Sequence, residues 1–75
     1  MYRIILVDDE PLILAGIASL IQWESLGCTL VGKATNGPNA LELIRETQPD
    51  IVITDIRMPV MDGLELIGRC REEGM

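Results

Sequence analysis

Two apolar runs in this 75-residue sequence each end abruptly at acidic residues. The run 4–7 is followed directly by Asp8, Asp9 and Glu10, and the run 51–54 is followed by Asp55. Short runs of Ile, Leu and Val without polar alternation are typical of parallel strands that helices cover on both faces. Parallel strands need long, usually helical crossovers between them, so the two runs predict an α/β fold.

A helix is predicted after the first run. Pro11 can occupy its first turn, where no backbone donor is lost, and we expect the helix to end near residues 23–27. A second strand is predicted at residues 29–34. In the helix predicted after Pro11, the apolar residues that recur at helical spacing are Ile13, Ile17, Leu20 and Ile21.

Two further helices are predicted in the second half of the sequence. The turn 36–38 begins one of them, which Pro49 ends, and Gly63 begins the other. The resulting order βαβαβα predicts one domain over residues 1–75, with a parallel sheet and right-handed crossovers. The apolar stripe of the third helix is Leu64, Ile67 and Cys70. Surface pairs at helical spacing are Glu42 with Arg45 and Glu65 with Arg69.

The composition argues against several function classes. Twelve acidic against six basic side chains give a net charge of −6, which argues against binding nucleic acid through its phosphates. Histidine, the most common general base and zinc ligand, is absent. No apolar run reaches the roughly 18 residues of a membrane span, and no signal peptide is evident. Cys28 and Cys70 fit two buried thiols in a reducing cytosol, so we expect a cytoplasmic protein.

The acids at the strand ends predict a metal site. In open α/β sheets, ligands bind beyond the carboxyl ends of the strands. If the first and third strands are neighbours, Asp8, Asp9 and Asp55 converge, which is unfavourable without a cation. Mg²⁺ prefers such oxygen ligands. Acids before a helix can also act only as caps, but their occurrence at equivalent ends of two strands favours a site.

With these residues in view, the sequence resembles the response-regulator receiver domain of bacterial two-component systems. The stretches that carry the resemblance are ILVDDEP (5–11), NGPNALELI (36–44) and PDIVITDIRMPVMDGLEL (49–66). The resemblance implies a three-layer, flavodoxin-like fold with strand order 2-1-3 in the part present here. It also implies a phosphoacceptor module rather than an enzyme, with a sensor histidine kinase as its partner.

The resemblance further assigns roles to individual residues. It implies that Asp55 is the phosphoacceptor, and that Asp8 and Asp9 hold Mg²⁺ together with Asp55. The backbone carbonyl of Arg57 is implied as a further metal ligand. The pair 58–59 is implied to shape the loop beside the site, and the pair 62–63 to start the third helix.

The sequence departs from the family pattern after the third helix. Receivers carry two further βα units, with a Ser or Thr after strand four and a Lys after strand five. This sequence ends at Met75, and its only lysine, Lys33, lies in the second predicted strand. We therefore expect a partial receiver domain without a DNA-binding domain. The alternative is a fragment that only folds and self-associates, and an uncovered third strand would favour a homo-oligomer through its edge.

A weaker resemblance concerns IQWESLGCTLVGKATNG, residues 21–37. Receivers fused to AraC-type helix-turn-helix regulators carry a similar Trp after the first helix, which suggests a transcription regulator as the parent protein. The simpler alternative is that Trp23 only packs at a helix end. A P-loop in GCTLVGKA is disfavoured because Ala34 lacks the required hydroxyl, and an EF-hand from Asp55 onward is disfavoured by Arg57.

Overall fold

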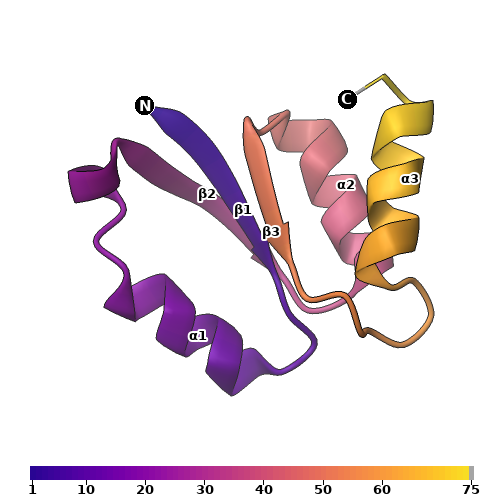
Figure 1. The fold of residues 1–75 in the computed structure, drawn as a ribbon, viewed down its shortest axis with the longest axis horizontal. Coiled ribbons are helices and arrows are strands. Elements are labelled where there is room, and N and C mark those ends of the chain that lie inside the picture. Colours follow the sequence, from indigo (N-terminus) through magenta and orange to yellow (C-terminus); the bar gives the residue numbers. More distant parts are fainter. Residues whose placement is uncertain (75) are drawn as a thin grey trace.

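A three-stranded parallel sheet forms the centre of the computed structural model, which describes residues 1–74 (Figure 1). Its strands are β1 (Tyr2–Val7), β2 (Cys28–Ala34) and β3 (Ile51–Thr54), in the order β2-β1-β3. The predicted strand order 2-1-3 is therefore confirmed. The central position of β1 explains its apolar sequence, because a middle strand is buried on both faces.

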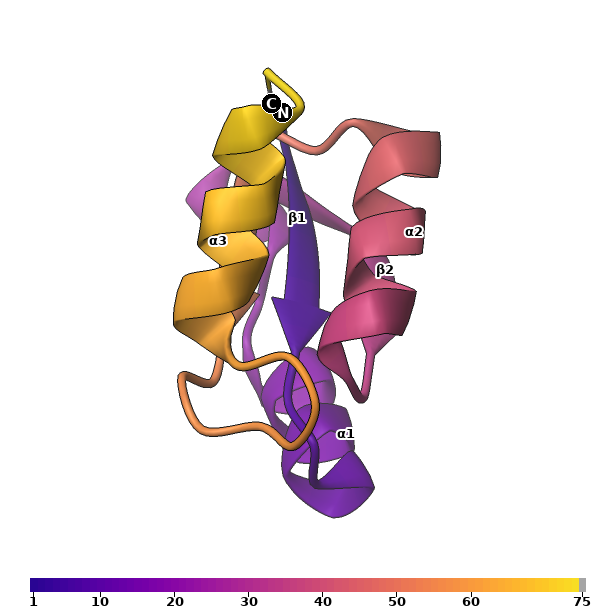
Figure 2. The ribbon, with the colours of Figure 1, turned by 90° about the vertical axis from the view of Figure 1, so that its right-hand side faces the viewer.

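Three helices cover the two faces of the sheet. They are α1 (Pro11–Leu20), α2 (Gly37–Thr47) and α3 (Gly63–Glu72), and the short 3₁₀-helix η1 (Glu24–Leu26) joins α1 to β2. Helix α1 lies on one face, whereas α2 and α3 lie side by side on the other (Figures 1 and 2). The predicted three-layer α/β architecture is confirmed.

The side chains of β1 divide the core into two clusters. Ile5 and Val7 point to the α2–α3 face and join a cluster of nine buried residues, while Ile4 and Leu6 join a cluster of three with Leu14 of α1. This division follows from the alternation of side chains along a strand. The remaining members of the larger cluster are Ala34, Ala40, Leu41, Ile44, Met58, Met61 and Leu66.

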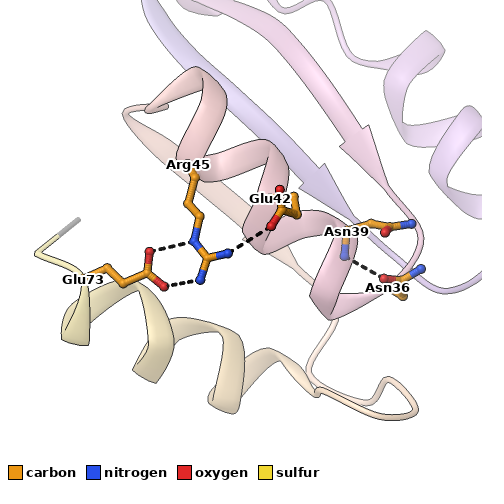
Figure 3. A network of polar contacts seen from close by, with 5 residues as sticks. All are labelled: Asn36, Asn39, Glu42, Arg45 and Glu73. Carbon is orange, nitrogen blue, oxygen red and sulfur yellow. Dashed lines mark hydrogen bonds and ion pairs between the residues drawn. The ribbon is translucent and has the colours of Figure 1, made fainter.

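Helices α2 and α3 start where the sequence predicts, and each start is fixed by a side-chain cap. The Asn36 carboxamide oxygen accepts a hydrogen bond from the backbone N–H of Asn39 at 2.8 Å (Figure 3). The Asp62 carboxylate accepts one from the N–H of Glu65, also at 2.8 Å. Each cap satisfies a helix donor that would otherwise lack a partner.

An ion pair joins the far ends of α2 and α3. The Arg45 guanidinium contacts the Glu73 carboxylate through two nitrogens, with Nη2 2.6 Å from Oε2 and Nε 2.8 Å from Oε1 (Figure 3). The predicted pairs of Arg45 with Glu42 and of Arg69 with Glu65 are confirmed at 3.1 and 3.9 Å. All these side chains are exposed or nearly so, so the pairs contribute little individually.

The buried faces of two helices differ from the sequence prediction. In α1 the one buried residue is Leu14, whereas Leu20 of the predicted stripe is 82% exposed. In α3 the buried apolar side chain is that of Leu66, whereas Leu64 is 65% exposed. Helix α1 also ends at Leu20, before the predicted 23–27, because the chain turns into η1.

The two cysteines are half-buried, so the prediction that both are buried is wrong. The contacts of Cys70 with the larger cluster remove part of its thiol from water, and this burial raises its pKa. Within residues 1–74, no helix has the length and apolar character that crossing a membrane requires.

Candidate functional site

The acids of the candidate site directly follow the last paired residues of two neighbouring strands, β1 and β3. Val7, the last residue of β1, pairs with both Ala34 and Thr54. The backbone N–H of Asp8 donates to the carbonyl of Ala34 at 3.1 Å, and that of Asp55 donates to the carbonyl of Val7 at 2.9 Å. Asp8 and Asp55 therefore leave neighbouring strands at the same edge of the sheet.

Three carboxylates converge at this edge. Asp8, Asp9 and Asp55 each offer one carboxylate oxygen, and these oxygens lie within 4.8 Å of one another. Asp8 and Asp9 are half-buried and Asp55 is partly open to solvent. A groove between α1 and β3 opens beside Asp8 and Asp55. The convergence predicted from the two strand ends is thus present in the structure.

The charges of this cluster are not balanced by basic side chains among residues 1–74, because the ion pairs found there involve other acids. The hydrogen bonds to Asp8 and Asp55 come from the backbone: the N–H of Glu10 donates to Asp8 at 2.9 Å, and that of Arg57 donates to Asp55 at 3.2 Å. Close carboxylates without a basic partner repel one another. Their chemistry and spacing therefore fit a small divalent cation with oxygen ligands.

The loop 55–62 connects β3 to α3 and begins with Asp55. Its Asp55 carboxylate accepts from the Arg57 N–H two residues later, which turns the chain back over the strand end. Met58 and Met61 of this loop are both buried, whereas Val60 between them is 89% exposed. Val60 also has a left-handed backbone with a φ of 71°.

Helix α3 begins directly behind the phosphoacceptor candidate. The Gly63 N–H donates to the carbonyl of Ile56 at 2.9 Å, and Asp62 caps the helix. The predicted start of α3 at residues 62–63 and the role of residues 58–59 in the loop are consistent with this arrangement. Sequence reasoning did not predict the burial of Met61, because no helical or strand periodicity extends through this loop.

The comparison with protein families decides the assignment. The sequence pattern of the response regulator receiver domain matches residues 4–75. The chain belongs to the response regulator receiver family. Receiver domains generally bind Mg²⁺ at an acidic pocket, which corresponds to the cluster of Asp8, Asp9 and Asp55.

Relatives of this receiver chain include regulators of transcription. The transcriptional regulatory protein YesN of Bacillus subtilis is 63% identical over 67 residues, which cover 89% of this chain and 18% of YesN. The receiver domain of AraT, a response regulator from Geobacillus stearothermophilus, superposes with a TM-score of 0.88 at 37% identity. That match covers 95% of this chain and 55% of the AraT chain.

A third comparison bears on the AraC-type resemblance. A two-component transcriptional regulator AraC from Clostridium phytofermentans superposes with a TM-score of 0.88 at 36% identity, over 96% of this chain and 56% of that one. These neighbours confirm the flavodoxin-like receiver fold. Trp23 itself packs against the smaller cluster, and its indole N–H donates to the Ala18 carbonyl at 3.1 Å.

The P-loop alternative does not fit the structure. Residues 28–34 form β2, an extended strand, where a phosphate-binding loop would need a turn that gathers backbone N–H groups. Lys33 lies within this strand, as the sequence predicts.

Proposed function

We propose that this chain is a phosphoacceptor module in which Asp55 receives a phosphoryl group from a sensor histidine kinase. The observation that carries the proposal is the convergence of three carboxylates at the carboxyl ends of β1 and β3, without a basic partner in residues 1–74. Asp55 lines the groove beside α1 together with Asp8, and a donor would reach it from that groove.

The reaction needs only groups that this proposal names. A carboxylate oxygen of Asp55 attacks the phosphorus atom of a phosphohistidine, a phosphorus–oxygen bond forms, and the phosphorus–nitrogen bond breaks. The electron pair of that bond stays on the leaving imidazole, and Asp55 becomes a mixed anhydride of carboxylic and phosphoric acids. The donor comes from outside these 75 residues, which contain no histidine.

Asp8, Asp9, Asp55 and the backbone carbonyl of Arg57 would hold Mg²⁺ in this module. The ion would supply positive charge next to the phosphoryl oxygens, where negative charge is concentrated during transfer. Asp8 and Asp9 are suited to this task because they directly follow the buried end of β1, where the Asp8 N–H is bonded to the Ala34 carbonyl. The parent protein is proposed to be a cytoplasmic regulator of transcription, by analogy with YesN.

The decisive experiment is mass measurement of the intact chain after incubation with Mg²⁺ and a small acyl phosphate. We expect an increase of about 80 Da, the mass of one phosphoryl group bound in place of a proton. Asp55→Asn should abolish the adduct. Asp50→Asn is the matched control, because Asp50 lies just before the opposite end of the same strand and accepts a hydrogen bond from the Arg3 N–H at 2.7 Å. An adduct that survives Asp55→Asn would contradict the assignment.

Metal binding is tested separately by thermal unfolding. A ligand that binds only the folded chain stabilises it, by about 2.7 kcal/mol at 100 times its Kd. We expect millimolar Mg²⁺ to raise Tm, and Asp9→Asn to reduce that rise. Equal Tm values with and without Mg²⁺ would count against a shared metal site.

The alternative, that the chain only folds and self-associates, is supported by the position of β3. This strand lies at one edge of the sheet, and its residues Ile51 and Ile53 are 41% and 47% exposed. An open edge can pair with a second chain, so we propose a homo-oligomer through β3. Light scattering tests this, and a monomer at high concentration would contradict it. The mass experiment separates the two functions, because self-association gives no adduct.

A further inference from the structure

The loop that follows Asp55 is held against the start of α2 by an unusually close contact. A side chain at Gly37, the first residue of α2, would place its Cβ 2.5 Å from both the Cβ and the backbone oxygen of Met61. Gly37 and Met61 are both buried. The absence of a side chain at Gly37 is therefore what allows Met61 to reach its place in the core.

A tight turn delivers Met61 to this contact. The Met61 N–H donates to the Pro59 carbonyl at 2.8 Å, which closes a three-residue turn around Val60. The φ of 71° at Val60 is the value expected at the centre of such a γ-turn, and it is strained for a β-branched residue. Strain of this kind persists only where surrounding contacts enforce it, and the buried neighbours Met58 and Met61 provide them.

The other end of the loop is held equally closely. A Cβ at Gly63 would lie 2.6 Å from the backbone oxygen of Asp55 and 3.0 Å from the Cα of Ile56. The loop 55–62 is thus fixed at two glycines that begin helices, Gly37 in α2 and Gly63 in α3. Figure 2 shows this loop crossing between the starts of the two helices.

The path of this loop also orients the site. Within the loop, the Arg57 N–H donates to the Asp55 carboxylate at 3.2 Å, and Arg57 carries the carbonyl expected to face the metal. From these contacts we propose that Gly37 is a positioning residue for the Asp55 site, acting through Met61 and the loop. The proposal rests on the function proposed above for Asp55, and the atoms nearest to a Cβ at Gly37 all belong to Met61 rather than to the acids.

A methyl group at Gly37 cannot be accommodated by a rotating side chain. One of the two nearest atoms belongs to the backbone of Met61 and the other is its Cβ, so the loop itself must move. Reaching the ordinary contact distance of 3.4 Å from 2.5 Å requires a displacement of nearly 1 Å. A misplacement of about 1 Å at a reacting group can slow a reaction by about 100-fold.

The test compares Gly37→Ala with Gly68→Ala. Gly68 lies in α3, and a Cβ there would have nothing within 4 Å, so it is the matched control. Without Mg²⁺, we expect Gly37→Ala to shift the amide resonances of Asp55 and Arg57 in NMR spectra, and Gly68→Ala to leave them unchanged. At saturating Mg²⁺ and well below each Tm, Gly37→Ala should slow phosphorylation by acyl phosphate by about 10- to 100-fold.

Unchanged resonances of Asp55 and Arg57 in a folded Gly37→Ala variant would overturn the proposal, as would an unchanged phosphorylation rate. If that variant does not fold, Met61→Ala takes its place, with Ile44→Ala at the other end of α2 as a control of similar core loss. We expect only Met61→Ala to shift the Arg57 amide, and equal effects of both would overturn the proposal. If the unmutated chain is never phosphorylated, the function proposed for Asp55 is refuted. The amide shifts of Asp55 and Arg57 would still decide whether Gly37 positions the loop.

Discussion

The two faces of the sheet are covered very differently. On the α2–α3 face, nine buried residues form one cluster that includes both methionines of the loop 55–62. On the α1 face, three buried residues form the other, and Leu12 and Leu20 of α1 remain 89% and 82% exposed. The close approaches at Gly37 and Gly63 both lie at the starts of the helices that cover the first face.

This difference separates two tasks of the candidate site. Asp55 and its loop are backed by the larger cluster, which holds a strained turn in place. Asp8 and Asp9 follow β1 toward α1, next to the groove that leaves the acids accessible. The well-packed face therefore fixes the loop that begins at Asp55, the proposed acceptor, and the thinly covered face carries the groove through which a donor would reach it.

The largest expected effect comes from truncating each cluster in turn. Leu66→Ala should lower the free energy of unfolding by about 4 kcal/mol, near the upper end for a buried Leu, because the dense cluster around it cannot collapse into the cavity. Leu14→Ala should cost only about 2 kcal/mol, since the groove beside it already admits solvent. Urea denaturation measures both values.

Leu64→Ala is the control for these two variants, because Leu64 lies on α3 near Leu66 but is 65% exposed. It should change stability by less than about 0.5 kcal/mol. Equal losses for Leu66→Ala and Leu14→Ala would contradict the distinction between the two faces.

The elements of this fold could be predicted from the sequence, but the buried helix faces could not. Apolar runs ending in acids predicted β1 and β3, and the turn 36–38 and Gly63 marked the starts of α2 and α3. Helix α1, with the sequence PLILAGIASL, is apolar nearly all round, so periodicity alone does not select its buried face. The choice of Leu14 depends on packing against the sheet, which is a tertiary effect.

The convergence of the acids was predictable for a related reason, and the anchoring of the loop was not. Neighbouring parallel strands bring their carboxyl ends together, so two strand ends were enough to predict that Asp8, Asp9 and Asp55 meet. The contact between Gly37 and Met61 joins the start of α2 to the loop between β3 and α3, which is distant in the sequence. No local pattern encodes that contact, because a glycine before a proline is also expected of any turn.

A smaller effect is expected from relieving the strain at Val60. Val60→Gly should raise the free energy of unfolding by about 1 kcal/mol. A positive φ costs a β-branched residue about 1–3 kcal/mol. Glycine removes this cost, and the larger conformational entropy that it gives the unfolded chain offsets only part of the gain. Thermal unfolding measures the gain. Gly27, which directly precedes β2, also has a positive φ, of 73°.

Gly27→Ala is the matched control for Val60→Gly. A Cβ at Gly27 would have nothing within 4 Å, so only backbone strain should act, and we expect a loss of about 1 kcal/mol. A destabilising Val60→Gly would show that the exposed Val60 side chain contributes contacts that outweigh its strain.

The smallest expected effect concerns the ion pair that joins α2 and α3 at the end opposite the acids. The hydrogen bond from Arg45 lowers the pKa of Glu73 below its ordinary value of 4.5, and the same bond raises the pKa of Arg45. A carboxyl whose pKa is lower in the folded state stabilises the fold above its unfolded pKa, and this contribution is lost as the pH falls through the folded value. Glu73→Gln should therefore lower Tm slightly at pH 7, and the difference from the parent chain should disappear in strong acid. Because both side chains are exposed, salt should also reduce the difference. A difference in Tm that persists unchanged at low pH would show that Glu73 acts through packing rather than through its charge, and the closure of α2 on α3 would then rest on the apolar cluster alone.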